Sequence, residues 1–259
     1  MSGDSIKISI ITVCYNSSST IRDTLHSVSS QLYKNIEHVI VDGGSSDNTI
    51  SLVKQFGNRV RKQVSCSDRG IYDAMNKGLA MASGDYVAYL NSDDFYTNNE
   101  VIQQVAAAIN KTNVDAIYGD LSYVKRNNPE FRVRYWKSQM FESGSFARAF
   151  SPPHPTFFAK RKILVELGGF DLSYSLAADF DLMFRALEIK KYTSCYLPRE
   201  LIRMRTGGAT NISLKNVIRQ NQEILRSLRS HGASVSSAAF IVRKLISRIR
   251  QRFLKNSAS

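Results

Sequence analysis

The chain has 259 residues, of which 43% are hydrophobic and 22% are charged, and its formal net charge is +13 at pH 7. This length allows a sizeable buried core, and no uninterrupted apolar stretch approaches the ~20 residues of a bilayer-spanning helix. Three cysteines at wide spacing, without a CxxC pair, argue against both a disulfide framework and a structural zinc site.

The first nine residues lack the apolar core of a signal peptide, so we expect a cytoplasmic protein. Short apolar runs then alternate with helix-like segments. The runs predict strands over residues 8–13, 37–41, 62–65, 86–90 and 115–118, separated by helices over 20–32, 49–56, 71–82 and 98–110. This alternation predicts an α/β fold with a mixed, mainly parallel sheet flanked by helices.

The alternation becomes less regular after about residue 120. The pattern predicts a hairpin with arms at 121–125 and 131–136, helices at 162–167 and 179–187, and a strand at 192–197. We therefore expect one domain over residues 1–214, with halves of about 1–120 and 121–214, and a helical extension over 215–259.

The predicted extension is strongly basic. It carries ten Lys and Arg side chains and a single acid, Glu223. From Ser237 to Lys255 one helical stripe is apolar and the basic side chains lie largely elsewhere; the stripe comprises Ala238, Ile241, Val242, Leu245, Ile246, Ile249 and Phe253. This pattern is typical of a helix that binds an anionic membrane surface. The alternative is a helix that docks its apolar stripe on the domain and leaves its charges in solvent.

Polar clusters follow three of the predicted strands, at Asp42, at residues 67–70 and at residues 91–94. In open α/β sheets ligands bind beyond the carboxyl ends of the strands, so these clusters are expected to line one pocket. The adjacent carboxylates of Asp93 and Asp94 repel each other, and a common reason to hold such a pair is a divalent cation. Mg²⁺ or Mn²⁺ would complete its shell with substrate phosphates and water.

Each cluster also has a purely structural interpretation. Asp42-Gly43-Gly44 is typical of a turn before a helix, and Asp93-Asp94 could cap the following helix. The occurrence of three such clusters at successive strand ends favours a binding site.

Four segments carry a resemblance to a known family. They are residues 10–16 (IITVCYN), 41–49 (VDGGSSDNT), 68–78 (DRGIYDAMNKG) and 82–94. In order and spacing they resemble the family 2 glycosyltransferases of GT-A fold, whose nucleotide-binding half is Rossmann-like, and the resemblance covers roughly residues 6–205. It implies an inverting transfer from a nucleoside-diphosphate sugar, UDP-linked, to an acceptor hydroxyl.

The resemblance also assigns roles to single residues. It implies a donor-binding set of Thr12, Tyr15, Asn16, Asp42, Asp68, Gly70, Asn76, Asn91, Ser92 and Asp93. Within this set Asp93 is the implied metal ligand, and Asp94 is expected to share the metal or to orient its waters. Asn91 departs from the family, which has an acid at this position.

In the second half, Asp179 matches the catalytic base of the family, and its structural alternative is a helix N-cap. Asp181 is better explained as an acid of the first helical turn or as a partner for Arg185 at i+4. His154 lies in a proline-rich segment that fixes its position. A lone histidine is usually structural, but the resemblance implies a place near the donor diphosphate or the acceptor. Residues 168–171 resemble a turn that shapes the acceptor side.

The similar bacterial enzymes build polysaccharides of the O-antigen and colanic-acid type. The resemblance therefore implies a lipid-linked glycan acceptor in cell-surface polysaccharide biosynthesis, and a peripheral position on the inner face of the cytoplasmic membrane.

Two other functions have to be weighed. A sugar nucleotidyltransferase would carry a Gly-rich loop with Lys or Arg after the first strand, whereas this chain has residues 15–19 (YNSSS) there. A basic nucleic-acid-binding module fits the high pI, but the concentration of charge in the extension argues against it.

Overall fold

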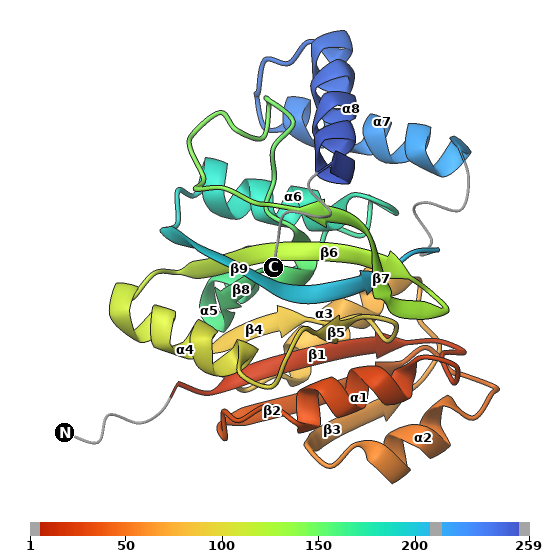
Figure 1. Cartoon of the computed structure of the whole chain (residues 1–259). Helices are drawn as coiled ribbons and strands as arrows, with labels where there is room; N and C mark the ends of the chain where they lie inside the picture. The colour runs from red at the N-terminus through yellow and green to blue at the C-terminus, as the bar shows by residue number, and fades with distance from the viewer. Residues whose placement is uncertain (1–5, 208–213, 254–259) are drawn as a thin grey trace.

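The computed structural model describes residues 6–207 and 214–253 (Figure 1). Within these residues nine strands form one sheet in the order β3-β2-β1-β4-β8-β6-β9-β5, and β7 pairs with β6 outside this path. The strands are β1 Ile8–Cys14, β2 Ile36–Asp42, β3 Val60–Ser65, β4 Tyr86–Tyr89, β5 Phe95–Tyr96, β6 Ala116–Lys125, β7 Asn128–Trp136, β8 Phe158–Lys160 and β9 Ser194–Arg205.

The first four strands are parallel, as the sequence predicts. β1 pairs with β2 and with β4, and β2 pairs with β3, so their carboxyl ends meet at one edge of the sheet. Every residue of β1 and β2 is buried, as expected for strands covered on both faces. The helices between them are α1 Ile21–Ser29, α2 Thr49–Phe56 and α3 Ile71–Met81. The α/β fold with a mainly parallel sheet is therefore confirmed.

The second half of the chain completes the sheet. β6 and β9 are parallel to each other, whereas β8 is antiparallel to both β4 and β6 and joins the two halves. The predicted hairpin is present as β6 and β7, but residues 116–125 form one continuous strand. β9 extends to Arg205, well beyond the predicted end at 197. β5 and β8 have two and three residues, too few to show a period, and they escaped prediction.

The helices of this half lie close to their predicted positions. They are α4 Val101–Thr112, α5 Arg161–Glu166 and α6 Ala178–Phe184. α6 continues as a short π-helical segment, Arg185–Ile189, which completes the predicted helix of 179–187.

Two large apolar clusters cover the two faces of the sheet. Alternate residues of β1 enter opposite clusters, with Ile8 and Ile10 on the α4 side and Ile11 and Val13 on the side of α3 and α6. α7, Leu214–Ser230, packs on α6 and adds Leu228 to the second cluster. The first helix of the extension is therefore part of the same core as the predicted domain.

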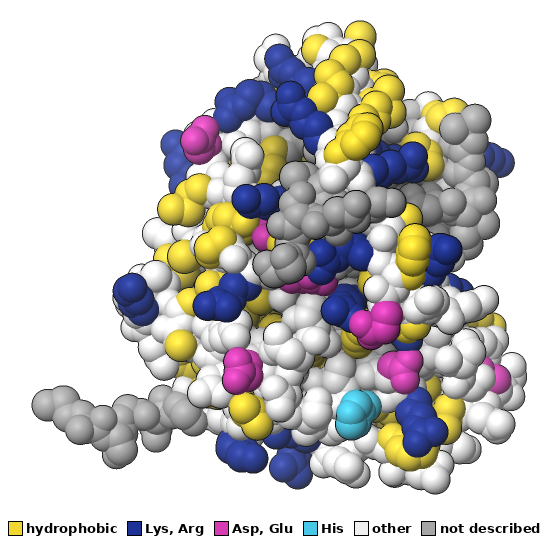
Figure 2. All heavy atoms as spheres, in the orientation of Figure 1, with side chains coloured by type: hydrophobic (Ala, Val, Ile, Leu, Met, Phe, Trp, Pro, Cys, Tyr) yellow, Lys and Arg dark blue, Asp and Glu magenta, His cyan; other side chains and the backbone are white. Residues whose placement is uncertain are grey.

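The last helix, α8 (Ser237–Phe253), agrees with the predicted amphipathic helix, and residues 254 and 255 lie outside the described residues. Phe240, which lies outside the predicted stripe, is buried, whereas the six large side chains of the apolar stripe are 45–79% exposed and form a ridge beside basic side chains (Figure 2). The exposed members are Ile241, Val242, Leu245, Ile246, Ile249 and Phe253. The alternative in which the stripe docks on the domain is therefore not what the structure shows. None of the described helices is long and apolar enough to cross a membrane.

Candidate active site

Asp42 ends β2 and organises the loop that follows. Its carboxylate is buried and accepts hydrogen bonds from the amides of Gly44 and Ser45, at 3.1 and 2.9 Å, and from the hydroxyls of Ser45 and Ser65, at 2.5 and 2.7 Å. Burial alone would raise the pKa of Asp42, but these hydrogen bonds outweigh it and lower the pKa. The carboxylate is therefore ionised and committed to holding the loop in shape.

The loops after β1, β2 and β3 approach one another closely at Gly43. A Cβ atom at Gly43 would lie 2.6 Å from Asp68 Oδ2 and 3.4 Å from the Tyr15 ring. The Tyr15 side chain is 65% exposed, and Asp68 Oδ1 accepts a 2.9 Å hydrogen bond from the Gly70 amide. Gly70 takes the φ of +118° that starts α3. These four residues form an open platform with one exposed aromatic face.

Three other predicted donor-binding residues make contacts within the protein. Thr12 is fully buried and its hydroxyl lies 2.9 Å from Nε2 of His38. Asn16 accepts a 2.9 Å hydrogen bond from the Ser46 amide and so ties the loops after β1 and β2 together. The Ser92 hydroxyl lies 2.8 Å from that of Ser17 and so connects the loop after β4 to the loop after β1.

The cluster Asn91–Asp94 follows β4 in a tight turn, closed by a 3.1 Å hydrogen bond from the Asp94 amide to the Asn91 carbonyl. The Asp93 side chain is 25% exposed and lies 3.8 Å from Nη1 of Arg126. Asp94 is fully buried, and its Oδ1 accepts a 3.3 Å hydrogen bond from the Arg205 amide. The two carboxylates therefore point into different surroundings.

Burial raises the pKa of Asp93, and it raises the pKa of Asp94 well above its usual range, with the charge of Asp93 adding to the effect. The positive charge of Arg205 partly offsets this rise in both pKa values. Its guanidinium donates to the Asp93 carbonyl oxygen at 2.8 Å and pairs with Asp23. Two adjacent acids with raised pKa values form a site that a nearby cation would stabilise.

The residues around Asp93 fit a divalent cation that is shared with a substrate. Among residues 6–207 and 214–253, no group of three or more His, Cys, Asp or Glu side chains is arranged to hold a metal by itself. Asn91 Oδ1, however, is buried and has no hydrogen-bond partner within the described chain. A carboxylate and a free amide oxygen at the end of β4 suit a Mg²⁺ or Mn²⁺ ion that takes its other ligands from phosphates and water.

Asp179 lies in the first turn of α6, partly exposed, and accepts a 3.1 Å hydrogen bond from the Tyr72 hydroxyl of α3. The Tyr72 ring stacks on Phe170, with ring centroids 5.4 Å apart. His154 stacks on Tyr89 at 5.5 Å and meets Phe170 edge-on at 5.6 Å. An aromatic floor thus connects Asp179 to the end of β4, two residues before Asn91.

The electrostatics agree with this arrangement. Burial lowers the pKa of His154, and the carboxylate of Asp179 opposes that shift. Burial and the charge of Asp179 raise the pKa of Tyr72 well above its usual range, so Tyr72 stays a hydrogen-bond donor. Tyr72 was not singled out from the sequence, although it lies inside the segment 68–78 that carried the resemblance.

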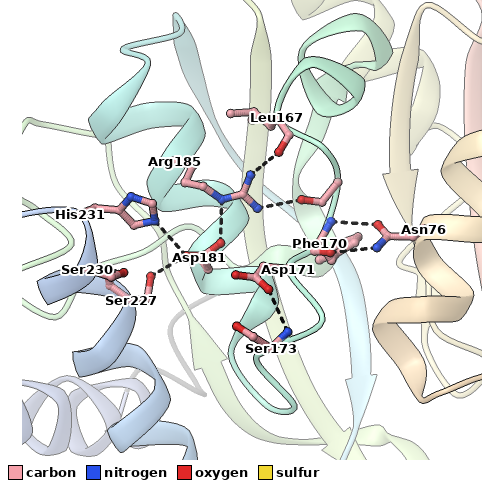
Figure 3. A network of polar contacts seen from close by, with 11 residues as sticks. Asn76, Leu167, Phe170, Asp171, Ser173, Asp181, Arg185, Ser227, Ser230 and His231 are labelled. Atoms are coloured by element: carbon pink, nitrogen blue, oxygen red, sulfur yellow. Dashed lines mark hydrogen bonds and ion pairs between the residues drawn. The ribbon is translucent and has the colours of Figure 1, made fainter.

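Asn76 was predicted to bind the donor, but the structure gives its amide a different contact. Its Oδ1 and Nδ2 pair with the amide and carbonyl of Phe170, at 2.8 and 2.9 Å (Figure 3). A Cβ atom at Gly169, where φ is +70°, would lie 2.4 Å from Asn76 Oδ1, so this close contact needs glycine. Asn76 therefore holds the turn of residues 168–171 against α3.

Asp181 makes the ion pair with Arg185 that the i+4 spacing predicts, at 2.7 Å (Figure 3). Arg185 also donates to the carbonyls of Leu167 and Gly169, at 2.6 and 2.7 Å. On its other side Asp181 accepts a 2.8 Å hydrogen bond from the Ser227 hydroxyl of α7. Asp181 is thus a buried structural acid that anchors the turn and α7, while Asp179 of the same helix faces the site.

Comparisons with known proteins agree with this geometry. Residues 9–168 match the family model "Glycosyl transferase family 2". An uncharacterised glycosyltransferase of Mycobacterium tuberculosis is 31% identical over 188 residues, which cover 69% of this chain and 68% of that protein.

Two solved structures share the fold. One is S. aureus TarS 1–349 in complex with UDP-GlcNAc, with a TM-score of 0.66 and 18% identity, covering 97% of this chain and 73% of that one. The other is the mannosyltransferase PcManGT of Pyrobaculum calidifontis in complex with GDP-Man and Mn²⁺. Its TM-score is 0.66 at 18% identity, covering 98% and 76% of the two chains.

Fold and similarity together define a glycosyltransferase of GT-A fold. Because the family model spans more than half of the sequence, the chain belongs to glycosyl transferase family 2.

Proposed function

We propose that the protein transfers a sugar, with inversion, from a nucleoside-diphosphate sugar to an acceptor hydroxyl, with Asp179 as the base. The observation that carries the proposal is the setting of the Asp179 carboxylate. It is partly exposed, it accepts a hydrogen bond from Tyr72, and no ion pair engages it among residues 6–207 and 214–253. A carboxylate that is held in place but not neutralised is suited to accept a proton.

In this reaction Asp179 takes the proton of the acceptor hydroxyl while the hydroxyl oxygen attacks the anomeric carbon. The bond from that carbon to the diphosphate breaks on the opposite face, and the configuration inverts. Tyr72 and the aromatic floor of Tyr89, His154 and Phe170 fix the direction of the base. A divalent cation held by Asp93 would stabilise the charge of the departing diphosphate.

The donor side is proposed to be the platform of Tyr15, Gly43, Asp68 and Gly70, with Asn91 and Asp93 toward the diphosphate. An exposed aromatic ring beside a carboxylate suits a nucleoside base, through stacking and hydrogen bonding. The structural relatives bind UDP-GlcNAc and GDP-Man, and we propose a UDP-linked sugar here.

A donor screen by thermal shift tests the proposal. UDP- and GDP-sugars are each added with and without Mn²⁺, and melting temperatures are compared with those of the free protein. The cognate donor at ~100 times its dissociation constant should add about 2.7 kcal/mol, which raises the melting temperature by roughly 5 °C or more in the presence of Mn²⁺. Failure of every nucleotide sugar to stabilise the protein would count decisively against the proposed function.

We further propose that the acceptor is a lipid-linked glycan of cell-surface polysaccharide biosynthesis, and that α8 rests on an anionic membrane surface at the cytoplasmic side. Six exposed apolar side chains on one face of α8 support this, together with the absence of Asp and Glu from residues 237–253. Neighbouring basic side chains would each contribute on the order of 1 kcal/mol of attraction to anionic lipid.

Vesicle binding tests the membrane proposal. In a sedimentation assay, the double variant Leu245→Gln/Ile249→Gln should bind phosphatidylglycerol-containing vesicles at least about tenfold more weakly than the unmodified protein. The reason is that two apolar side chains that would be buried in the lipid are replaced by polar ones. Val165→Gln, an equally exposed apolar position on α5, is the matched control. Equal binding by all three proteins would contradict the proposal, as would an α8-dependent dimer without vesicle binding.

A further inference from the structure

α8 lies on the protein with its polar side inward. The apolar stripe faces out, whereas the residues that face the domain recur at helical spacing and are mostly polar. These inward-facing residues are Phe240, Lys244, Ser247, Arg248 and Gln251. A helix that only packed on a core would present the opposite face. The Gln251 Oε1 atom is buried and has no partner within the described chain, so this inner face is not closed by ordinary packing.

β7 faces α8 and adds a third cationic side chain. α8 packs on β7, and Arg134 of β7 places its guanidinium 3.7 Å above the Tyr123 ring centroid. The Arg134 Nε atom is buried and without a hydrogen-bond partner in the part of the chain that the structure describes. Burial lowers the pKa of Arg134, and the charges of Arg248 and Arg252 on α8 lower it further, in agreement with the packing of α8 on β7.

Lys244 extends this cationic surface toward α7. Its amine donates a 2.7 Å hydrogen bond to Asn221 Oδ1 of α7. Burial and then the charge of Arg248 lower the pKa of Lys244 to about 7, while the carboxylate of Asp179 opposes the shift. Lys244 thus lies on the same inner face of α8 as Arg248, at the contact of α8 with α7.

The described part of the chain offers these cations no carboxylate partner. Within residues 6–207 and 214–253, no ion pair is formed by Lys244, Arg134, Arg248 or Arg252. Like charges that approach one another while partly buried destabilise the folded state unless an anion joins them. Guanidinium groups favour phosphate, which they bind through paired hydrogen bonds.

We propose that β7 and the inner face of α8 form a binding site for a phosphate or diphosphate group of the acceptor, held by Arg134, Arg248 and Lys244. The proposal rests on the proposed glycosyl transfer and names its acceptor class. The donor diphosphate is expected at Asp93, whereas Lys244 is within the electrostatic influence of Asp179, the group that must contact the acceptor hydroxyl. The exposed stripe of the same helix would meet the lipid to which such a phosphate is attached.

The first test is a titration with inorganic pyrophosphate by isothermal calorimetry, without metal and without donor. Arg134→Gln and Arg248→Gln should each weaken binding by about tenfold. Arg250→Gln, an exposed arginine of the same helix, is the matched control and should change the affinity by less than about twofold. Circular dichroism melting curves identify any variant that fails to fold. Because Arg134 and Arg248 lie on different elements, one variant that folds is enough to test the proposed site.

Three results would overturn the proposal: no pyrophosphate binding by the unmodified protein, equal affinity in all variants, or displacement of pyrophosphate by UDP, which would assign the anion to the donor site. A competition arm separates acceptor phosphate from membrane phosphate. A short-chain alkyl diphosphate should displace pyrophosphate, whereas phosphatidylglycerol vesicles should not, and displacement by vesicles would assign the cluster to lipid headgroups instead.

These titrations need no sugar transfer. A negative result in the pyrophosphate titrations would therefore contradict the anion site but not the proposed sugar transfer. A failure of the proposed sugar transfer would be detected separately in the donor screen.

Discussion

The Asp179→Asn variant should lose about 10³-fold in kcat for sugar transfer while keeping its affinity for the donor within about twofold. The asparagine amide is isosteric with the carboxylate, and its oxygen can still accept the hydrogen bond from Tyr72, so the fold should be retained. What is lost is the capacity to take the acceptor proton, and general-base catalysis typically supplies 10²–10⁴-fold in rate.

The measurement is the initial rate of transfer at saturating donor and acceptor, with donor affinity taken from the thermal-shift titration. Glu166→Gln, which neutralises an exposed acid at the end of α5, is the matched control and should keep full activity. Full activity in Asp179→Asn would remove the base assignment. A parallel loss of donor affinity would indicate that Asp179 acts in binding rather than in proton transfer.

The first half of the fold follows from the sequence because its strands are buried on both faces. A largely apolar run such as residues 8–13 is typical of a buried strand, so the polar residues that follow it are expected at the sheet edge, near the ligand-binding crevice. The positions of Asp42, Asp68 and the Asn91–Asp94 cluster could be predicted from the sequence in this way.

The contacts that those residues make could not be predicted from the sequence. Whether a carboxylate faces a ligand or its own loop depends on a few backbone dihedral angles, and Asp42 proves to be committed to loop amides and hydroxyls. Asn76 lies in a segment typical of the family, yet its amide pairs with Phe170, 94 residues away in the chain. No local pattern encodes such a partner.

The orientation of α8 shows the same limit. Helical periodicity separates the two faces of the helix but does not say which face meets the protein, and here a mostly polar face with Lys244 and Arg248 does. Arg134 joins Arg248 only because the β6-β7 hairpin carries it under α8, a juxtaposition that depends on tertiary packing. The candidate anion site was therefore visible only in three dimensions.

Asp93→Ala should abolish measurable transfer and remove the Mn²⁺-dependent part of donor stabilisation in the thermal-shift assay. Asp93 is the member of the acidic pair whose side chain is partly exposed, whereas Asp94 is fully buried, and its raised pKa favours the protonated form, which binds metal poorly. Glu142→Ala, which removes an exposed acid elsewhere, should preserve the Mn²⁺ effect.

The Asp94→Asn variant tests whether Asp94 binds the metal together with Asp93. Because a protonated Asp94 and an asparagine have nearly the same shape and neither carries charge, this variant should retain Mn²⁺-dependent donor stabilisation if Asp93 is the sole protein carboxylate on the metal. Loss of the Mn²⁺ effect in Asp94→Asn, with the melting temperature of the free protein unchanged, would instead place both carboxylates on the ion, with Asp94 ionised upon metal binding.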